Sequence, residues 1–437
     1  MKYYILIVFL AVTQFLFAQE FNQAKLDEYF SLLTRHNRFM GSVALSKEGK
    51  IIYQKAIGFS DVENNRKATS ASRYRIASIS KTFTAVLVMK AVEEEKLQPG
   101  QTIGRFFPSV KNSDRITIQH LLNHRSGIWD FTSDKDYLNW NSRPRSRAEM
   151  VRLIAEGGST FDSGEKSRYS NSNYVLLTYI LEDVFEKTYA GLLSEYITQP
   201  LGLTNTYVGG EIDPTDRESH SYSYLISWQK ATETDPSVTV GAGAIVSTPA
   251  DLTAFSDALF GGKLLTEASV EKMKTMNGQF GLGLAEFSFH DKTGYGHTGR
   301  IDEFTTIFIH FPEEKVSYAL TSNGTIINKN DITSTVLSAA FNQPFELPEY
   351  KTYNVTEGEL EQYPGTYTSK QIPLKVMVSK NENALSAQAT GQPAFPLEAI
   401  DKHTFRYERA GIVMEFNPEE KTMILKQGGG EFLYKME

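Results

Sequence analysis

Runs of strand-forming residues occur early and late in the chain, and this separation constrains the fold most strongly. Residues 41–45 and 51–58 form one predicted hairpin, and 304–311 and 316–321 form a second. A single hairpin is only marginally stable in water, so each needs further strands or helices to pack against. We therefore expect one antiparallel sheet built from both ends of a domain, with a helical insert between them. The fold class predicted is α+β, an α/β sandwich.

Helical spacing of apolar residues surrounds and separates these strands. It occurs over 21–38, over 83–92 and over 332–341, where a helix would close the domain. Thr117 is an N-cap residue type at the start of a short helix, which Gly127 is expected to end. The insert then alternates helix and loop up to about residue 203.

The chain changes character near Pro344, where prolines interrupt any regular element. Short runs at 374–378, 405–407 and 432–434 alternate apolar and polar residues, as strands with one buried face do. A small all-β module, a barrel or a sandwich, is therefore expected. The predicted divisions are a main domain over 19–343, a linker over 344–356 and the all-β module over 357–437.

The first eighteen residues resemble a secretory signal peptide. Lys2 precedes an apolar run over 5–12, and Ala18 precedes a polar pair. Leu16 is bulky for its place before a cleavage site, which leaves an uncleaved anchor as the alternative. We expect residues 1–18 to direct export, to the periplasm or outside the cell, with no integral membrane span after their removal.

Composition excludes several function classes. The net charge of −7, without a basic stripe, argues against nucleic acid and against an anionic membrane surface. The absence of cysteine excludes disulfides, a cysteine nucleophile, a thiolate zinc site and an iron–sulfur cluster. His120 and His124 do not belong to a metal-binding pattern such as H-E-x-x-H, and structural roles are expected for both. No metal and no cofactor are predicted, the partner expected is a small-molecule or peptide substrate, and the oligomeric state is left open.

A possible nucleophile lies at the start of the run over 83–92. Ser78 precedes Lys81 by three residues, a rotation of ~300° along a helix, so the two side chains would share one face. An amine at that distance can take the hydroxyl proton, and a helix N-terminus favours an oxyanion. The S-x-x-K spacing occurs four times in this chain, however, so it needs support from other motifs.

Two later motifs supply that support. Tyr169 and Asn171 form Y-x-N, and His297, Thr298 and Gly299 form H-x-G. With S-x-x-K in this order, the chain resembles the serine β-lactamase and penicillin-binding-protein family, nearest its class C, D-aminopeptidase and esterase-like branch, over about 25–341. The resemblance makes 19–343 a serine hydrolase domain.

The expected chemistry is acyl transfer. Ser78 would attack a carbonyl after Lys81, or a Tyr169 phenolate stabilised by that lysine, removes its proton. Asn171 would orient Lys81 or hold a substrate amide. The resemblance implies an oxyanion hole made by the backbone N–H groups of Ser78 and Arg300, and Gly299 would let an edge strand lie close to the substrate.

Some features leave alternatives open. Lys292-Thr293-Gly294 is a literal K-T-G, but the histidine motif leads into the strand at 304–311, so we interpret the K-T-G as a hairpin turn. Asp302-Glu303 stands where relatives often have Pro-Gly, and this acidic pair is either a charged rim or a solvated turn.

The function expected is an exported serine hydrolase acting on D-amino-acid peptides, cell-wall fragments or small esters. A class C-like β-lactamase and a non-catalytic binding or sensing protein are the alternatives. His297, in place of the lysine usual in true lactamases, favours the peptidase or esterase.

Overall fold

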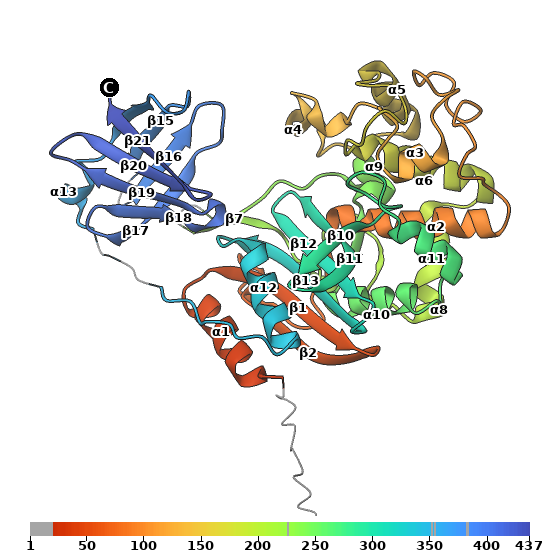
Figure 1. Cartoon of the computed structure of the whole chain (residues 1–437), viewed down its shortest axis with the longest axis horizontal. Helices are drawn as coiled ribbons and strands as arrows, with labels where there is room; N and C mark the ends of the chain where they lie inside the picture. The colour runs from red at the N-terminus through yellow and green to blue at the C-terminus, as the bar shows by residue number, and fades with distance from the viewer. Residues whose placement is uncertain (1–20, 225–226, 351–352, 354, 382–383) are drawn as a thin grey trace, which may run out of the picture.

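The computed structural model describes residues 21–437, apart from 225–226, 351–352, 354 and 382–383. The predicted signal peptide, residues 1–18, lies outside the described residues. The chain forms a sheet with helices on both faces and a β-barrel beside it (Figure 1). Within the described part of the chain, no helix is both long enough and apolar enough to cross a membrane.

The main sheet is antiparallel and takes its strands from both ends of the domain. Its strand order is β10-β11-β12-β13-β1-β2. The early and late hairpins meet where β1 pairs with β13, with Val43 opposite Leu320. This confirms the predicted fold class. The strands are β1 (Phe39–Lys47), β2 (Lys50–Ile57), β10 (Ala285–Phe289), β11 (Lys292–Ile301), β12 (Phe304–Phe311) and β13 (Val316–Thr325).

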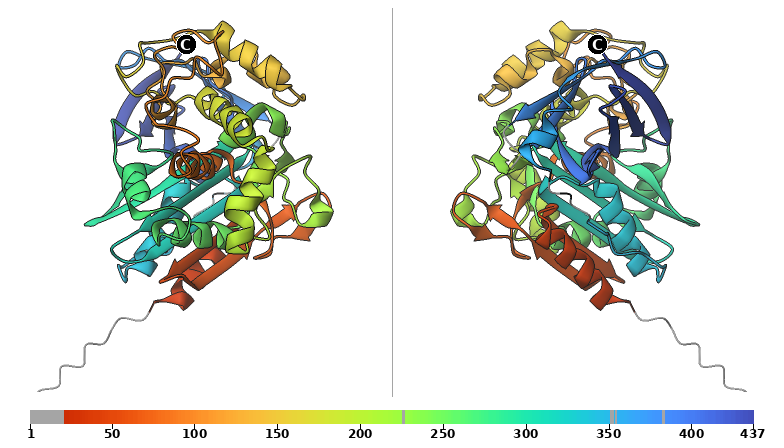
Figure 2. Two further views of the ribbon diagram at one scale, coloured as in Figure 1. Left: turned by 90° about the vertical axis from the view of Figure 1, so that its right-hand side faces the viewer. Right: turned by 90° about the vertical axis from the view of Figure 1, so that its left-hand side faces the viewer.

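Alternation along the strands assigns the two faces of the sheet. On β12, Ile307 and Ile309 join the apolar cluster under α1 and α12, whereas Phe308 joins the larger cluster on the opposite face. There Phe83 of α2 stacks on Phe255 of α10, with ring centroids 3.8 Å apart. Figure 2 shows helices on both sides of the sheet. The helices named are α1 (Gln23–Arg35), α12 (Lys329–Ala340), α2 (Ser80–Glu93) and α10 (Pro249–Phe260).

The insert between β2 and β10 is mostly helical. Thr117 caps α3 through a capping box with His120, as the residue types predicted. The helix ends at Leu122, not at Gly127, because the chain turns at His124, whose φ of 57° is left-handed. Longer helices of the insert are α5 (Arg147–Gly157), α6 (Asn171–Phe185) and α11 (Glu267–Lys274). Short helices are η1 (Ala77–Ile79), α3 (Ile118–Leu122), η2 (Phe131–Ser133), α4 (Tyr137–Trp140), α7 (Tyr189–Leu193), η3 (Ser194–Thr198), α8 (Gln199–Leu201), η4 (Pro214–Asp216), α9 (Pro236–Thr239) and η5 (Val240–Ala242). Short strands are β3 (Phe59–Asp61), β4 (Arg66–Lys67), β5 (Tyr74–Arg75), β6 (Tyr207–Val208), β7 (Tyr222–Tyr224), β8 (Trp228–Lys230) and β9 (Ile245–Ser247).

The C-terminal module is a closed barrel of consecutive antiparallel strands, in which β14 pairs with β21. Closure leaves no strand edge without a partner. Tyr363, Phe405 and Phe416 pack in its interior. The all-β prediction is confirmed, and the predicted division points of the chain remain predictions. The elements are α13 (Glu357–Leu360), β14 (Gly365–Ser369), β15 (Val376–Asn381), β16 (Ala384–Ala389), β17 (Phe395–Asp401), β18 (Thr404–Tyr407), η6 (Glu408–Ala410), β19 (Ile412–Asn417), β20 (Thr422–Gln427) and β21 (Gly430–Met436).

Charged side chains join the barrel to the sheet domain. Arg38, only 4% exposed, donates to Glu398 of β17, with Nη1 2.7 Å from Oε2. Nearer the end of β11, Arg409 of η6 donates from Nη2 to Oε2 of Glu303 at 2.9 Å. These contacts place the barrel beside the end of the sheet that carries the candidate site.

Candidate active site

Ser78 lies in a tight turn at the beginning of α2. It is the middle residue of η1 and is half-buried, whereas its neighbours Ala77 and Ile79 are buried. Ala77 has a φ of 52°, a left-handed conformation that costs about 1–2 kcal/mol for a residue with a Cβ. Such strain persists only where surrounding contacts hold it, and it is common at active sites. The turn presents the Ser78 hydroxyl at the N-terminus of α2, as the sequence predicted.

Lys81 is fully buried beside this hydroxyl. Its Nζ lies 2.9 Å from Ser78 Oγ, 2.8 Å from Asn171 Oδ1 and 2.7 Å from the carbonyl oxygen of Ala242. Burial lowers the pKa of Lys81 to about 7, against the opposing charge of Asp130. A substantial fraction of Lys81 is therefore neutral at pH 7.

The contacts of Lys81 orient the neutral amine. Two of its three partners, Asn171 Oδ1 and the Ala242 carbonyl, can only accept hydrogen bonds. A neutral amine has two N–H groups, and these two acceptors use both. The remaining lone pair then points at the Ser78 hydroxyl, which can donate to it. Lys81 therefore has the geometry of a general base for Ser78.

Tyr169 lies on the other side of the same hydroxyl. Burial raises the pKa of Tyr169 well above its usual value, the Ser78 hydroxyl lowers it, and the charge of Asp130 raises it further. Lys81 Nζ is 4.9 Å from the centre of the Tyr169 ring. The phenol therefore stays protonated. The sequence left two candidates for the base, and this protonation favours Lys81 over a Tyr169 phenolate. Tyr169 has the form of a proton donor.

Aromatic rings fix the position of Tyr169. His124 stacks on it at 4.3 Å between ring centroids, and Phe280 and His297 lie at 5.7 and 6.3 Å. His124 Nδ1 accepts from the backbone N–H of Ser170 at 3.2 Å. Burial, with the charges of Lys81 and His297, holds the pKa of His124 well below its usual value. The neutral His124 ring packs against Tyr169 and orients it, which agrees with the structural role expected for His124.

Asp130 is a contributor that the sequence reasoning missed. It accepts from the backbone N–H of Asn171 at 3.0 Å and from Asn171 Nδ2 at 3.2 Å. These bonds turn Asn171 Oδ1 toward Lys81. Asp130 also caps η2 through Thr132, and a local capping pattern was the only sequence signal it carried.

The H-x-G motif lies on β11 next to Ser78. Pairing between β10 and β11 ends at Gly296, so the segment 297–301 has no strand partner on that side. A Cβ on Gly299 would lie 2.4 Å from the Ile76 carbonyl oxygen and 2.3 Å from Thr306 Oγ1. Gly299 therefore brings the strand against the turn before Ser78, whereas the sequence analysis related this glycine to the substrate.

His297 is a neutral acceptor. Its Nδ1 lies 2.6 Å from the Thr298 carbonyl oxygen, which can only accept, so the proton is on Nδ1 and Nε2 is free to accept. Burial and the charge of Lys81 lower the pKa of His297 to about 4.

The literal K-T-G is placed differently. The hairpin turn is formed by His290 and Asp291, and Lys292 to Gly294 are the first residues of β11, so their assignment to the turn itself was wrong. Lys292 Nζ pairs with Glu314 at 3.0 Å and does not line the cavity at Ser78.

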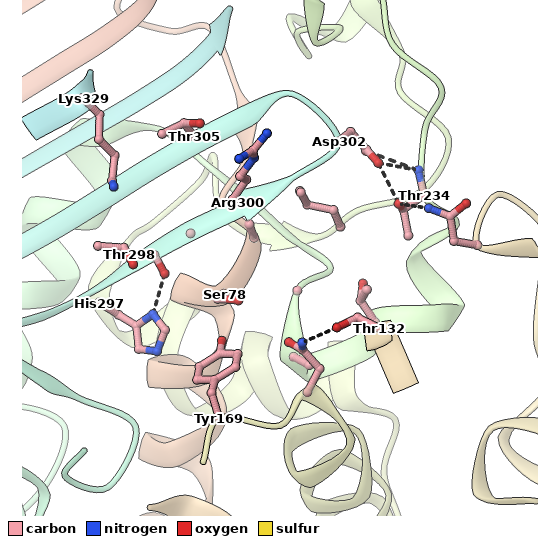
Figure 3. A pocket seen from close by; sticks show the side chains of 18 of the residues that line it. Ser78, Thr132, Tyr169, Thr234, His297, Thr298, Arg300, Asp302, Thr305 and Lys329 are labelled. Carbon is pink, nitrogen blue, oxygen red and sulfur yellow. Dashed lines mark hydrogen bonds between the residues drawn. The ribbon is translucent and has the colours of Figure 1, made fainter. Parts of the chain in front are cut away.

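Seven of the eight predicted site residues line one cavity of about 770 Å³. The eighth, Lys81, lies buried beneath this cavity. Figure 3 shows the Tyr169 hydroxyl directed toward Ser78, with Thr298 and Arg300 on the neighbouring strand. The side chain of Asp302 is 3% exposed, accepts from Thr234 Oγ1 at 2.6 Å and pairs with Arg75 at 3.6 Å. Desolvation of this carboxylate raises its pKa. Asp302 is thus neither a charged rim nor a solvated turn residue.

Ser269, the first residue of another S-x-x-K spacing, donates a hydrogen bond from its hydroxyl to Glu93.

Comparisons with known proteins show the family to which this chain belongs. The family model described as Beta-lactamase matches residues 26–340. Penicillin-binding protein 4* of Bacillus subtilis (strain 168) is 25% identical over 441 residues, which cover 93% of this chain and 97% of that protein. Teichoic acid D-alanine hydrolase of Staphylococcus aureus (strain MRSA252) is 29% identical over 252 residues, 57% of this chain and 58% of the relative.

A solved structure extends the likeness to the fold. The D-amino acid amidase from Ochrobactrum anthropi SV3 superposes with a TM-score of 0.65 and 26% identity, covering 73% of this chain and 99% of the amidase chain. The sequence match, the fold and the order of the three motifs lead to one assignment: this chain belongs to the beta-lactamase family of serine hydrolases.

Proposed function

We propose that the protein is an exported hydrolase that forms an acyl-enzyme on Ser78 and cleaves an ester or amide of a D-amino acid. The observation that carries the proposal is the set of three contacts at Lys81 Nζ, which direct its lone pair at the Ser78 hydroxyl. Export is supported by the signal-like pattern of residues 1–18.

The first half of the reaction forms the acyl-enzyme. Ser78 Oγ attacks the carbonyl carbon while its proton moves to the lone pair of Lys81 Nζ. The resulting oxyanion would face the backbone N–H groups of Ser78 and Arg300, and such donors contribute about 3–4 kcal/mol each in acyl-transfer enzymes. The C–O or C–N bond then breaks, and the leaving group takes a proton from the Lys81 ammonium, directly or through the Tyr169 phenol.

The second half restores the enzyme. A water molecule attacks the acyl carbon and gives its proton to neutral Lys81, and Ser78 Oγ leaves with the proton returned from that lysine. Tyr169, protonated throughout, donates a hydrogen bond at the reacting oxygen. His297, neutral near pH 7, offers Nε2 as an acceptor beside Tyr169.

The substrate class is supported by the relatives. Two similar proteins, a teichoic acid D-alanine hydrolase and a D-amino acid amidase, both have a D-amino acid in the names of their activities. His297 stands where the resemblance puts a lysine in true lactamases, which favours a peptidase or esterase. The pocket carries no lysine from the K-T-G at 292–294.

The test is intact-mass detection of the acyl adduct. The wild-type protein is mixed with D-alanine amide, D-alanine ethyl ester, a D-Ala-D-Ala peptide and benzylpenicillin, each quenched in acid. We expect a D-alanyl adduct on the wild type and on Ser269→Ala, the matched S-x-x-K serine, and none on Ser78→Ala. An adduct that persists on Ser78→Ala contradicts the nucleophile. Rapid turnover of penicillin with no reaction of the D-alanyl compounds would make the protein a β-lactamase instead.

A further inference from the structure

Cationic side chains from three separate parts of the chain meet in the active-site cavity. Arg300 follows the H-x-G motif on β11, Lys329 is the first residue of α12, and Arg409 belongs to the barrel. Figure 3 shows Arg300 and Lys329 on the same side of the cavity, with Thr305 between them. The barrel thus contributes a charged side chain to the cavity that contains Ser78.

Among the described residues, Arg409 is the one cation of the three that pairs with an acidic side chain. Asp302 is the one carboxylate among the described residues lining the cavity, and its bonds to Thr234 and Arg75 occupy it. Glu303 pairs with Arg409 at 2.9 Å. Within the described residues, neither Arg300 nor Lys329 forms an ion pair, and burial, then the charge of Arg300, lowers the pKa of Lys329. Two neighbouring cations therefore have no counterion among the residues that the structure describes.

A second cavity, of about 520 Å³, extends from the same side chains. Arg300 and Arg409 line it as well, together with residues of the barrel such as Phe395 and Tyr407. The two cavities adjoin at this pair of arginines. A substrate that extends beyond the reacting acyl group has room between the sheet domain and the barrel.

We propose that the barrel takes part in substrate recognition, because Arg409 completes, with Arg300 and Lys329, a subsite for an anionic group of an extended substrate. The group is a carboxylate or a phosphodiester, since both accept charge-assisted hydrogen bonds from guanidinium and ammonium donors. Arg409 acts in two ways: it neutralises Glu303, which would otherwise repel the anion, and its guanidinium N–H groups that are not bonded to Glu303 can donate to the anion. The inference rests on the proposed function of the site.

Matched D-alanyl esters test the subsite. One ester has a neutral alcohol, one has an alcohol bearing a carboxylate and one has an alcohol bearing a methyl phosphodiester. The quantity measured is the ratio of kcat/KM for an anionic ester to kcat/KM for the neutral ester. We expect this ratio to exceed about 10 for the wild type and to fall about tenfold in Lys329→Met, as loss of one charge-assisted contact predicts. Lys272→Met and Arg152→Gln, at exposed positions away from the cavity, are the matched controls and should keep the wild-type ratio.

The barrel has its own pair of variants. Arg409→Gln leaves Glu303 charged, so the ratio should fall further than in Lys329→Met, and adding Glu303→Gln should recover part of the loss. A preference for one anionic ester identifies its chemistry, carboxylate or phosphodiester. Equal kcat/KM for neutral and anionic esters, or equal ratios in Arg409→Gln and wild type, overturns the proposal.

A binding measurement separates this inference from the hydrolase reaction. Dimethyl phosphate, acetate and glycerol are titrated into full-length Ser78→Ala by calorimetry, with and without Lys329→Met. If an anion binds and its affinity falls about tenfold in Lys329→Met, the subsite is supported even when no ester is hydrolysed. In that case only the proposed reaction is rejected. Hydrolysis without anion binding and without charge preference leaves the reaction standing and rejects the subsite.

Discussion

At the scale of single residues, the site depends on keeping its titratable groups in chosen protonation states. Burial lowers the pKa of Lys81 toward neutrality and keeps His297 unprotonated and Tyr169 protonated near pH 7. The acceptors around Lys81 then decide where its lone pair points. Asp130 both turns the Asn171 amide and raises the pKa of Lys81, so it acts on the base as a positioning residue.

The first prediction concerns the pH dependence of hydrolysis. Only neutral Lys81 can accept the Ser78 proton, and its pKa is about 7, so kcat/KM for a D-alanyl ester should rise with pH through about 7 and level off above. Asp130→Asn removes the charge that raises this pKa and should move the rise to lower pH. Initial rates from pH 5 to 9 measure both profiles.

The matched control for this shift is Asp162→Asn, an exposed carboxylate that does not act on Lys81. Its profile should coincide with that of the wild type. A midpoint in Asp130→Asn that is equal to or above the wild-type midpoint would rule out Lys81 as the titrating base.

At the scale of elements, the site depends on how closely β11 packs against η1. Thr306 of β12 donates from Oγ1 to the Ile76 carbonyl oxygen at 2.9 Å, which ties the turn before Ser78 to the sheet. Gly299 leaves no atom between the strand and that turn. The backbone groups proposed to hold the oxyanion therefore depend on the absence of a Cβ at this position.

The second prediction follows from that contact. In Gly299→Ala the new Cβ would lie within 2.4 Å of the Ile76 carbonyl oxygen and of Thr306 Oγ1, so β11 and η1 must separate. Misplacing one oxyanion donor costs about 10²–10³-fold in kcat. We expect a loss of that size with KM changed less, measured by steady-state kinetics alongside circular dichroism and thermal unfolding to confirm that the protein is folded.

Gly100→Ala provides the control, because its Cβ would meet no atom within 4 Å and its φ is not left-handed. Full activity in Gly299→Ala would mean that the close approach of β11 to η1 is not needed for catalysis.

At the scale of the whole molecule, the buried Arg38 joins the sheet domain to partly exposed carboxylates of the barrel. Arg38 lies between Glu398 and Glu408 of the barrel and over the ring of Tyr350, 4.7 Å from its centroid. Burial alone would raise the pKa of Glu398, but the hydrogen bond and charge of Arg38 lower it overall. Removing one partner of a buried ion pair leaves an uncompensated charge, which costs about 3–5 kcal/mol when both are fully buried.

The third prediction is that Arg38→Met loosens the barrel. Because the side chain of Glu398 is 31% exposed, we expect a smaller loss of stability, about 2 kcal/mol. Limited proteolysis should release the barrel faster by cleavage within 344–356, detected by mass spectrometry.

Arg35→Met is the matched control, because Arg35 and Glu28 form an exposed ion pair within α1. Its proteolysis should match that of the wild type. If Arg38→Met and Arg35→Met are cleaved at the same rate, the buried charges do not hold the barrel in place.

Local patterns in the sequence determined much of this protein. Strand-forming runs in the early and late hairpins, the Thr117 cap and the order of the three motifs predicted the sheet, the insert and the residues that gather around Ser78. These features depend on spacing of a few residues, or on motifs characteristic of a family. The α+β fold and an all-β C-terminal module were predictable because burial of one face imposes a period on the residues, whereas the choice between a barrel and a sandwich was not.

Contacts between distant segments were decided by the tertiary structure alone. Asp130 acts on Asn171, the Ala242 carbonyl orients Lys81, Glu303 pairs with Arg409, and the burial that lowers the pKa of Lys81 comes from several elements at once. No local pattern encodes these contacts, because a hydrogen-bond partner or a desolvated site is defined by distance in space and not by separation along the chain. The sequence by itself determined which residues we propose to carry the chemistry. The packing of remote segments decided their protonation, their orientation and which barrel residue lines the cavity.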